Sequence, residues 1–162
     1  MIILDSCTII LLAKASVLEL FVMKKEVKIT PQVLEEVLAG KTKMFPDALL
    51  SQRLYQEHKI KTIPADEKVT LKLVKDFNMG EGEASSIAAA FKNKTIVGTD
   101  NRQGRKAAQV HNLNLIGSLE IVSYLYQNKI ISREKAFAAI KILREEGWFN
   151  TYLIEKVLED IQ

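Results

Sequence analysis

A chain of 162 residues is long enough to bury one core, and 48% hydrophobic with 27% charged residues is an ordinary globular balance. Its formal net charge of +3 permits a polyanionic partner without indicating one. The single cysteine, Cys7, excludes an internal disulfide, and the absence of CxxC and HExxH spacings argues against a zinc site. The apolar run after Asp5 ends at Lys14, far short of a membrane span, so we expect a cytoplasmic protein with no membrane segment.

Five short apolar runs predict the strands of a sheet. They are MIIL (1–4), EVKITP (26–31), KIKTIP (59–64), KTIVGTD (94–100) and LNLIGS (113–118), the second and third being weaker. Runs of this kind, separated by helical patterns, are typical of buried parallel strands with helical crossovers. We therefore expect one α/β domain over residues 1–162, a three-layer sandwich with a central, mainly parallel sheet flanked by helices.

Eight segments carry apolar residues three or four positions apart and are predicted to be helices. They span residues 31–40, 45–58, 66–77, 81–92, 102–112, 118–128, 132–147 and 150–161. The first has Pro31 in its first turn and Gly40 at its end, as helices commonly do. The C-terminal helices, 118–160, are rich in aromatic residues; we expect most of these in the core and this segment also to serve an interface.

Two aspartates follow predicted strands directly, Asp5 after MIIL and Asp100 after TIVGT. Functional groups in parallel α/β folds gather at the carboxyl ends of strands, so both carboxylates are expected in one crevice. A lone aspartate in such a place is more often a helix cap or turn residue. Two together favour a cation between them, because like charges at close range repel.

Glu81 and Glu83 open the predicted helix 81–92. At about 100° per residue they point in nearly opposite directions. Glu83 falls on the apolar face, with Ile87, Ala90 and Phe91, whereas Glu81 falls on the face predicted to be solvated, with Ser85, Ala89 and Lys92. Since a carboxylate is costly to bury alone, Glu83 is expected to have a cationic partner.

In the helix 31–40, Glu35 and Glu36 flank the apolar face at similar angles, and periodicity does not choose between them. Asp5, Glu83, Asp100 and one of this pair form a candidate cluster made only of carboxylates. Oxygen ligands suit hard cations such as Mg²⁺ or Mn²⁺. This cluster of carboxylates supports metal-assisted hydrolysis of a phosphodiester.

Four segments, MIILDSCTII, ITPQVLEEV, MGEGEASSIAAA and IVGTDNRQGRKAA, resemble in order and spacing the motifs of the PIN domain, most closely a VapC-like prokaryotic branch whose third motif reads Gly-x-Gly-Glu-Ala. The resemblance implies a Mg²⁺- or Mn²⁺-dependent endoribonuclease. It implies that the catalytic and metal-binding acids are Asp5, Glu36, Glu83 and Asp100. It also implies the toxin of a type II toxin–antitoxin pair, with RNA as substrate, an antitoxin protein as partner and a homodimer as the assembly.

Residues beside these acids are expected to support the site. Ser6 and Thr8 follow the first acid, where a helix-capping role is an equally good interpretation. Thr99 and Asn101 flank the fourth acid. Asn101 stands where related sequences often carry a second aspartate, and the lost charge could weaken a second metal site. The alternative function is therefore a non-catalytic PIN-like module that binds RNA or protein.

Arg102, Arg105 and Lys106 open the helix after the fourth acid. They are expected either to contact the phosphates of a nucleic acid or to form a solvated helix face, and the two interpretations weigh about equally. No aromatic residues of the kind that stack single-stranded bases are interleaved with these basic residues.

Overall fold

A five-stranded, fully parallel sheet forms the centre of the protein, in a computed structural model that describes residues 1–162. The strand order is β3-β2-β1-β4-β5, and the strands are β1 (Ile2–Leu4), β2 (Val27–Ile29), β3 (Ile60–Thr62), β4 (Ile96–Gly98) and β5 (Leu115–Ile116). The central strand β1 pairs on both sides, with Ile3 opposite Lys28 and Val97. Each strand lies within one of the five predicted runs, which confirms the predicted sheet.

Ten α-helices and one 3₁₀ helix surround the sheet. They are α1 (Ser6–Lys14), α2 (Leu18–Val22), α3 (Pro31–Leu38), η1 (Ala39–Lys43), α4 (Pro46–Gln56), α5 (Glu67–Phe77), α6 (Glu81–Asn93), α7 (Arg102–Val110), α8 (Ser118–Gln127), α9 (Arg133–Glu146) and α10 (Thr151–Ile161). All eight predicted helices are present. The sequence predicted neither α1 nor the short α2. In α1, residues 9–13 are all apolar, so no polar face gives a helical period.

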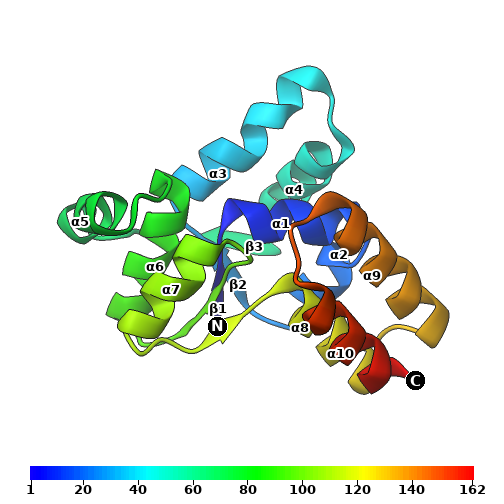
Figure 1. Cartoon of the computed structure of the whole chain (residues 1–162). Helices are drawn as coiled ribbons and strands as arrows, with labels where there is room; N and C mark the ends of the chain where they lie inside the picture. Colours follow the sequence, from blue (N-terminus) through cyan, green and yellow to red (C-terminus); the bar gives the residue numbers. More distant parts are fainter.

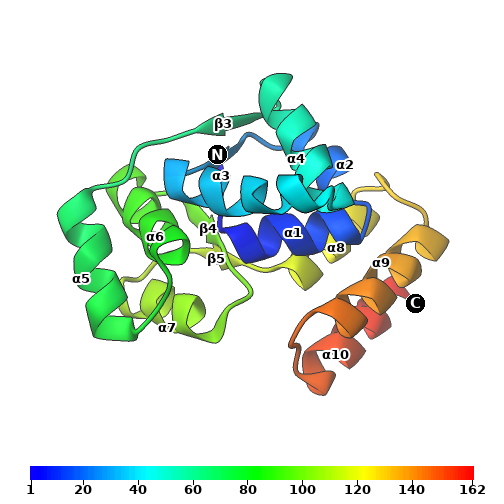
Figure 2. The same ribbon diagram turned by 90° about the horizontal axis from the view of Figure 1, so that it is seen from above.

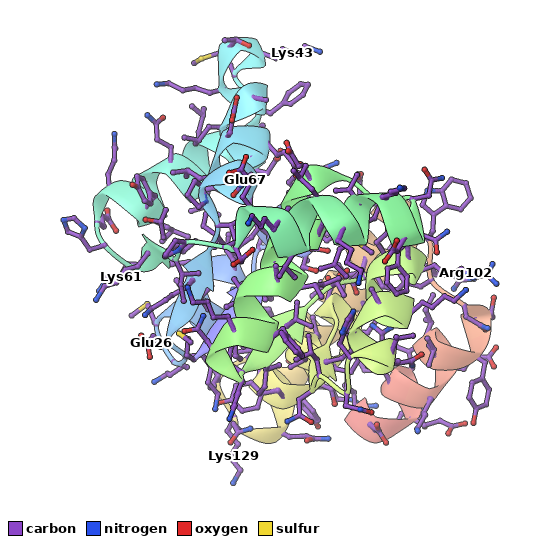
Figure 3. The ribbon with its side chains drawn as sticks, turned by 90° about the vertical axis from the view of Figure 1, so that its left-hand side faces the viewer. Glu26, Lys43, Lys61, Glu67, Arg102 and Lys129 are labelled. Carbon is purple, nitrogen blue, oxygen red and sulfur yellow. The ribbon has the colours of Figure 1, made fainter.

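Helices cover both faces of the sheet, so the predicted three-layer sandwich is confirmed. Along β1, Ile2 and Leu4 point into the larger core, with α1, α2 and α8–α10, whereas Ile3 points into the smaller core beneath α5–α7. Figures 1 and 2 show α5, α6 and α7 on one side of the sheet and α1, α8, α9 and α10 on the other. The α3–η1–α4 segment projects from the body, with Lys43 near its tip (Figure 3).

Helix α6 differs from its prediction. Ser85 and Ala89, placed on a solvated face by periodicity, are fully buried, and Phe91, placed on the inward face, is 52% exposed. The reason is that α6 packs against α3, α5 and α7 as well as against β1 and β4, so most of its circumference is covered. Small residues, mainly alanine and serine, make this close packing possible.

The carboxyl ends of four strands feed directly into helices. α1, α3, α7 and α8 begin within a few residues of the ends of β1, β2, β4 and β5, so their first turns surround one edge of the sheet. Helix N-termini carry unpaired N–H groups and a partial positive charge. This edge is therefore suited to hold anionic groups. None of the helices combines the length and the apolar character that crossing a bilayer requires.

Candidate active site

Four acidic side chains gather at this edge, and each accepts a hydrogen bond from a backbone N–H in the first turn of a helix. The pairs are Asp5 with Thr8 of α1 (2.8 Å), Glu36 with Gly82 of α6 (3.1 Å), Glu83 with Gly104 of α7 (3.0 Å) and Asp100 with Ser118 of α8 (2.9 Å). The acids thus lie near one another because the N-termini of α1, α6, α7 and α8 point toward this edge.

Two threonines link the acids to one another. Thr8 donates its backbone N–H to Asp5 and its hydroxyl to Asp100, over 2.8 and 3.2 Å. Thr99 is fully buried, and its hydroxyl lies 3.5 Å from Glu83 and close enough to Asp5 to lower the pKa of that carboxyl. Asp5 in addition caps α1, so the capping and the clustering interpretations of this residue hold together.

Glu36, and not Glu35, faces the other acids. Its carboxylate accepts the Ser6 hydroxyl at 2.5 Å as well as the Gly82 N–H at 3.1 Å. Glu35 is exposed and makes no side-chain hydrogen bond or ion pair. A Cβ at position 82 would collide with the Glu36 carboxylate, and one at position 104 would collide with Glu83, so both glycines are needed for these approaches.

Ser118 is a site residue that the sequence did not single out. It is fully buried, and both its backbone N–H (2.9 Å) and its hydroxyl donate to Asp100. Its position offered a signal, since it follows β5 just as Asp5 and Asp100 follow β1 and β4. In parallel α/β folds, functional hydroxyl groups as well as carboxylates gather at the carboxyl ends of strands.

No arginine or lysine neutralises these acids, because none of the ion pairs in the structure involves Asp5, Glu36, Glu83 or Asp100. Burial raises the pKa of Asp5 to about 6, partly offset by its hydrogen bonds to Thr99 and Thr8. Burial, followed by the charge of Asp5, raises the pKa of Glu83 to about 7. Burial also raises the pKa of Asp100. The site is a concentration of negative charge without a protein counter-ion.

The negative charge of these acids also affects the Cys7 thiol. Partial burial, and then the charges of Asp5, Asp100 and Glu83, raise the pKa of this thiol to about 12. A thiol of that pKa stays protonated at neutral pH and is a poor nucleophile. The single cysteine is therefore not the reactive group of this site.

The donor set fits a hard divalent cation in its chemistry, because it consists of carboxylates surrounded by hydroxyl groups. No three His, Cys, Asp or Glu side chains are grouped so that they could hold a metal ion together. Mg²⁺ is usually held by only one or two carboxylates and keeps several waters. The site thus provides two carboxylates with neighbouring hydroxyl groups as metal ligands, and not a set of protein ligands that would enclose the ion.

Asn101, expected to support the site, and the three basic residues expected to contact RNA lie beside Asp100. Asn101 is exposed, and its side-chain oxygen caps α7 by accepting the Gln103 N–H at 2.8 Å. Arg102 and Lys106 are exposed and free of ion pairs, and Arg102 projects away from the body of the protein (Figure 3). Arg105 instead donates to the Thr99 carbonyl (3.2 Å) and to Glu120 (3.1 Å).

The raised pKa values predict how stability depends on pH in the metal-free protein. Between about pH 4 and pH 7 the folded state holds more protons than the unfolded state, because the pKa values of Asp5 and Glu83 rise from 3.8 and 4.5 to about 6 and about 7. This stabilisation is complete below about pH 4 and is lost as the pH passes these folded-state values. For Asp5 it is on the order of 3 kcal/mol.

Denaturant unfolding in the presence of a chelator, repeated across this pH range, measures the effect. The free energy of unfolding is expected to fall as the pH rises through the window. If the free energy of unfolding stayed constant or rose between about pH 4 and pH 7, the pKa values of Asp5 and Glu83 would not be raised in the folded state.

The fold and the site together define an α/β protein with an acidic cluster at the carboxyl edge of its sheet. A protein-family model described as PIN domain matches residues 1–162 of the chain. The chain therefore belongs to the PIN domain family. PIN domains are generally nucleases and usually use divalent metals, so membership indicates a function of the nuclease type. The comparison with curated proteins found no match.

Proposed function

We propose that this protein is a Mg²⁺- or Mn²⁺-dependent endoribonuclease that hydrolyses RNA phosphodiester bonds. The observation that carries the proposal is the gathering of Asp5, Glu36, Glu83 and Asp100 without a basic partner. Membership of the PIN domain family supports it. The raised pKa values of three of these acids are what a site awaiting a cation would show.

In this proposal Asp5 and Asp100, joined through Thr8, are the principal metal ligands, and Glu83 and Glu36 complete the site. A divalent ion bound there lowers the pKa of water and offsets charge on the phosphodiester. Thr99, Ser118 and Ser6 orient the carboxylates through their hydrogen bonds. Arg102 and Lys106, which are exposed beside Asp100, bind phosphates of the RNA backbone.

The proposal extends, on the resemblance to VapC-like sequences alone, to the toxin of a toxin–antitoxin pair. A homodimer and an antitoxin protein bound through helices α8–α10 belong to the same proposal. Co-expression with the product of the neighbouring gene tests it: relief of growth arrest by a small DNA-binding protein is expected. Growth arrest that no neighbouring gene relieves would contradict the toxin role and leave the nuclease proposal in place.

Removal of divalent metal is expected to abolish RNA cleavage. Purified protein incubated with a structured RNA and Mn²⁺ should produce fragments that are absent when a chelator is added, and excess Mn²⁺ should restore them. Thermal unfolding in parallel should show that Mn²⁺ stabilises the protein more at about pH 8 than at about pH 5, because protons and metal compete for the same oxygens. Cleavage that persists in chelator would contradict the proposal.

One observation favours the alternative of a non-catalytic module. No three acids surround one point, and the Asn101 oxygen is engaged in capping α7. A protein of this kind would bind RNA or a protein partner but yield no fragments with any divalent metal. The same incubation, with binding measured beside cleavage, separates the two functions.

A further inference from the structure

A groove of about 1030 Å³ extends from the acidic site along the protein surface. Asp100 and Cys7 lie at its acidic end, α7 and α8 form its walls, and the connection between α9 and α10 closes its far side. Figure 2 shows this connection at the end of the two helices that lies nearer α7. The groove thus reaches the acidic site at Asp100.

Trp148 stands in the wall of this groove and is fully exposed. The connection that carries it is tied down on both sides. Before it, Glu146 pairs with Lys14 of α1 at 2.6 Å, and after it Phe149 packs against the larger core. The indole is therefore presented to solvent from an anchored segment, with no partner of its own in the protein.

The charge of the groove suits an anionic ligand. Arg102, Lys106 and Lys156 line it and take part in no ion pair. Its acids are largely compensated, because Glu120 pairs with Arg105 and Glu146 with Lys14. Apart from Asp100 itself, Asp160 is the one lining acid without a basic partner.

An exposed aromatic side chain beside unpaired basic residues is typical of surfaces that bind single-stranded nucleic acid. We propose that Trp148 stacks on an unpaired base of the RNA strand that enters the acidic site. This inference rests on the proposed function. No stacking surface was visible in the sequence, because Trp148 is far along the chain from the basic residues of α7 and only the fold brings them to one groove.

A protein segment with apolar and acidic residues is the rival occupant. Two features favour RNA: the groove leads directly to Asp100, and away from Asp100 its unpaired charges are three basic side chains and one acid, Asp160. The chain contains a single tryptophan, so its fluorescence reports on Trp148 alone. Titration with a short oligoribonucleotide in chelator, where cleavage is blocked, should quench this fluorescence. A duplex of the same sequence should quench it much less.

The contribution of the indole is measured by the affinity of a labelled oligonucleotide. Trp148→Ala is expected to weaken binding on the order of tenfold, and Trp148→Phe much less, because phenylalanine keeps an aromatic face. Tyr152→Ala is the matched control, since Tyr152 is an exposed aromatic on α10 that does not line the groove. An oligonucleotide lacking the stacked base should bind the wild type and Trp148→Ala equally. Circular dichroism should show that all variants are folded.

Unchanged fluorescence on adding RNA, together with unchanged affinity of Trp148→Ala, overturns the inference; this is also the result expected if the groove holds a protein segment. Such a result beside intact Mn²⁺-dependent cleavage leaves the proposed function standing. Quenching by single-stranded RNA without cleavage in Mn²⁺ supports the stacking role of Trp148 and overturns the endoribonuclease proposal.

Discussion

Replacing Asp5 with asparagine is expected to lower Mn²⁺-dependent RNA cleavage by at least about a hundredfold. Asp5 is 2% exposed and shares Thr8 with Asp100, so it occupies the centre of the acidic site. Asparagine keeps the shape and an oxygen that can accept the Thr8 N–H, but it removes the negative charge that binds a divalent ion. The measurement is the initial rate of cleavage by wild type and variant, purified side by side.

Stability provides the control for this substitution. Burial raises the pKa of Asp5 to about 6, so at higher pH the metal-free wild type holds a buried charge that the variant lacks. In chelator, at about pH 8, Asp5→Asn should therefore unfold at the same temperature as the wild type or higher. Loss of cleavage by an unfolded variant would be uninformative, and undiminished cleavage by a folded one would contradict the nuclease site.

Glu83→Gln is expected to lower cleavage by at least about tenfold, whereas Glu81→Gln should change it less than about twofold. The two residues lie in the first turn of the same helix, two positions apart. Glu83 accepts the Gly104 N–H at 3.0 Å, and the charges of Asp5 and Glu36 help to raise its pKa. Glu81 is exposed and makes no side-chain hydrogen bond or ion pair. Glutamine preserves the side-chain length in both variants.

The pair is a matched test because both changes replace a carboxylate in the first turn of α6 by an amide of the same length. Glu81→Gln should weaken the interaction with the helix dipole by about 0.3–1 kcal/mol. Glu83→Gln also removes a charge that burial disfavours, so in chelator at about pH 8 it should unfold at the same temperature as Glu81→Gln or higher. Unfolding curves check this difference. Equal losses of cleavage would show that total charge near the helix, and not the position of Glu83, governs activity.

Local patterns were sufficient to predict much of the fold. Each of the five strands lies within an apolar run recognised beforehand, and a parallel sheet with helical crossovers followed from their alternation with amphipathic segments. Helix α1 was not predicted because its uninterrupted apolar residues 9–13 show no polar face of the kind that marks a helix. The faces of α6 were wrongly assigned for a related reason, since Ser85 and Ala89 are covered by several neighbouring helices.

The sequence by itself determined that Asp5 and Asp100 stand at the carboxyl ends of parallel strands, and that Glu83 and Glu81 point in different directions. These properties depend on the position of a residue at the end of a strand and on the 100° step of a helix, which are local. Periodicity left Glu35 and Glu36 open, and the resemblance to a family pointed to Glu36. Only the tertiary structure brought Glu36 to Gly82 and Ser118 to Asp100, paired Arg105 with Glu120, and placed Trp148 in the groove beside the site. These contacts join segments far apart in the chain, and their geometry depends on how the helices pack, which no short stretch of sequence specifies.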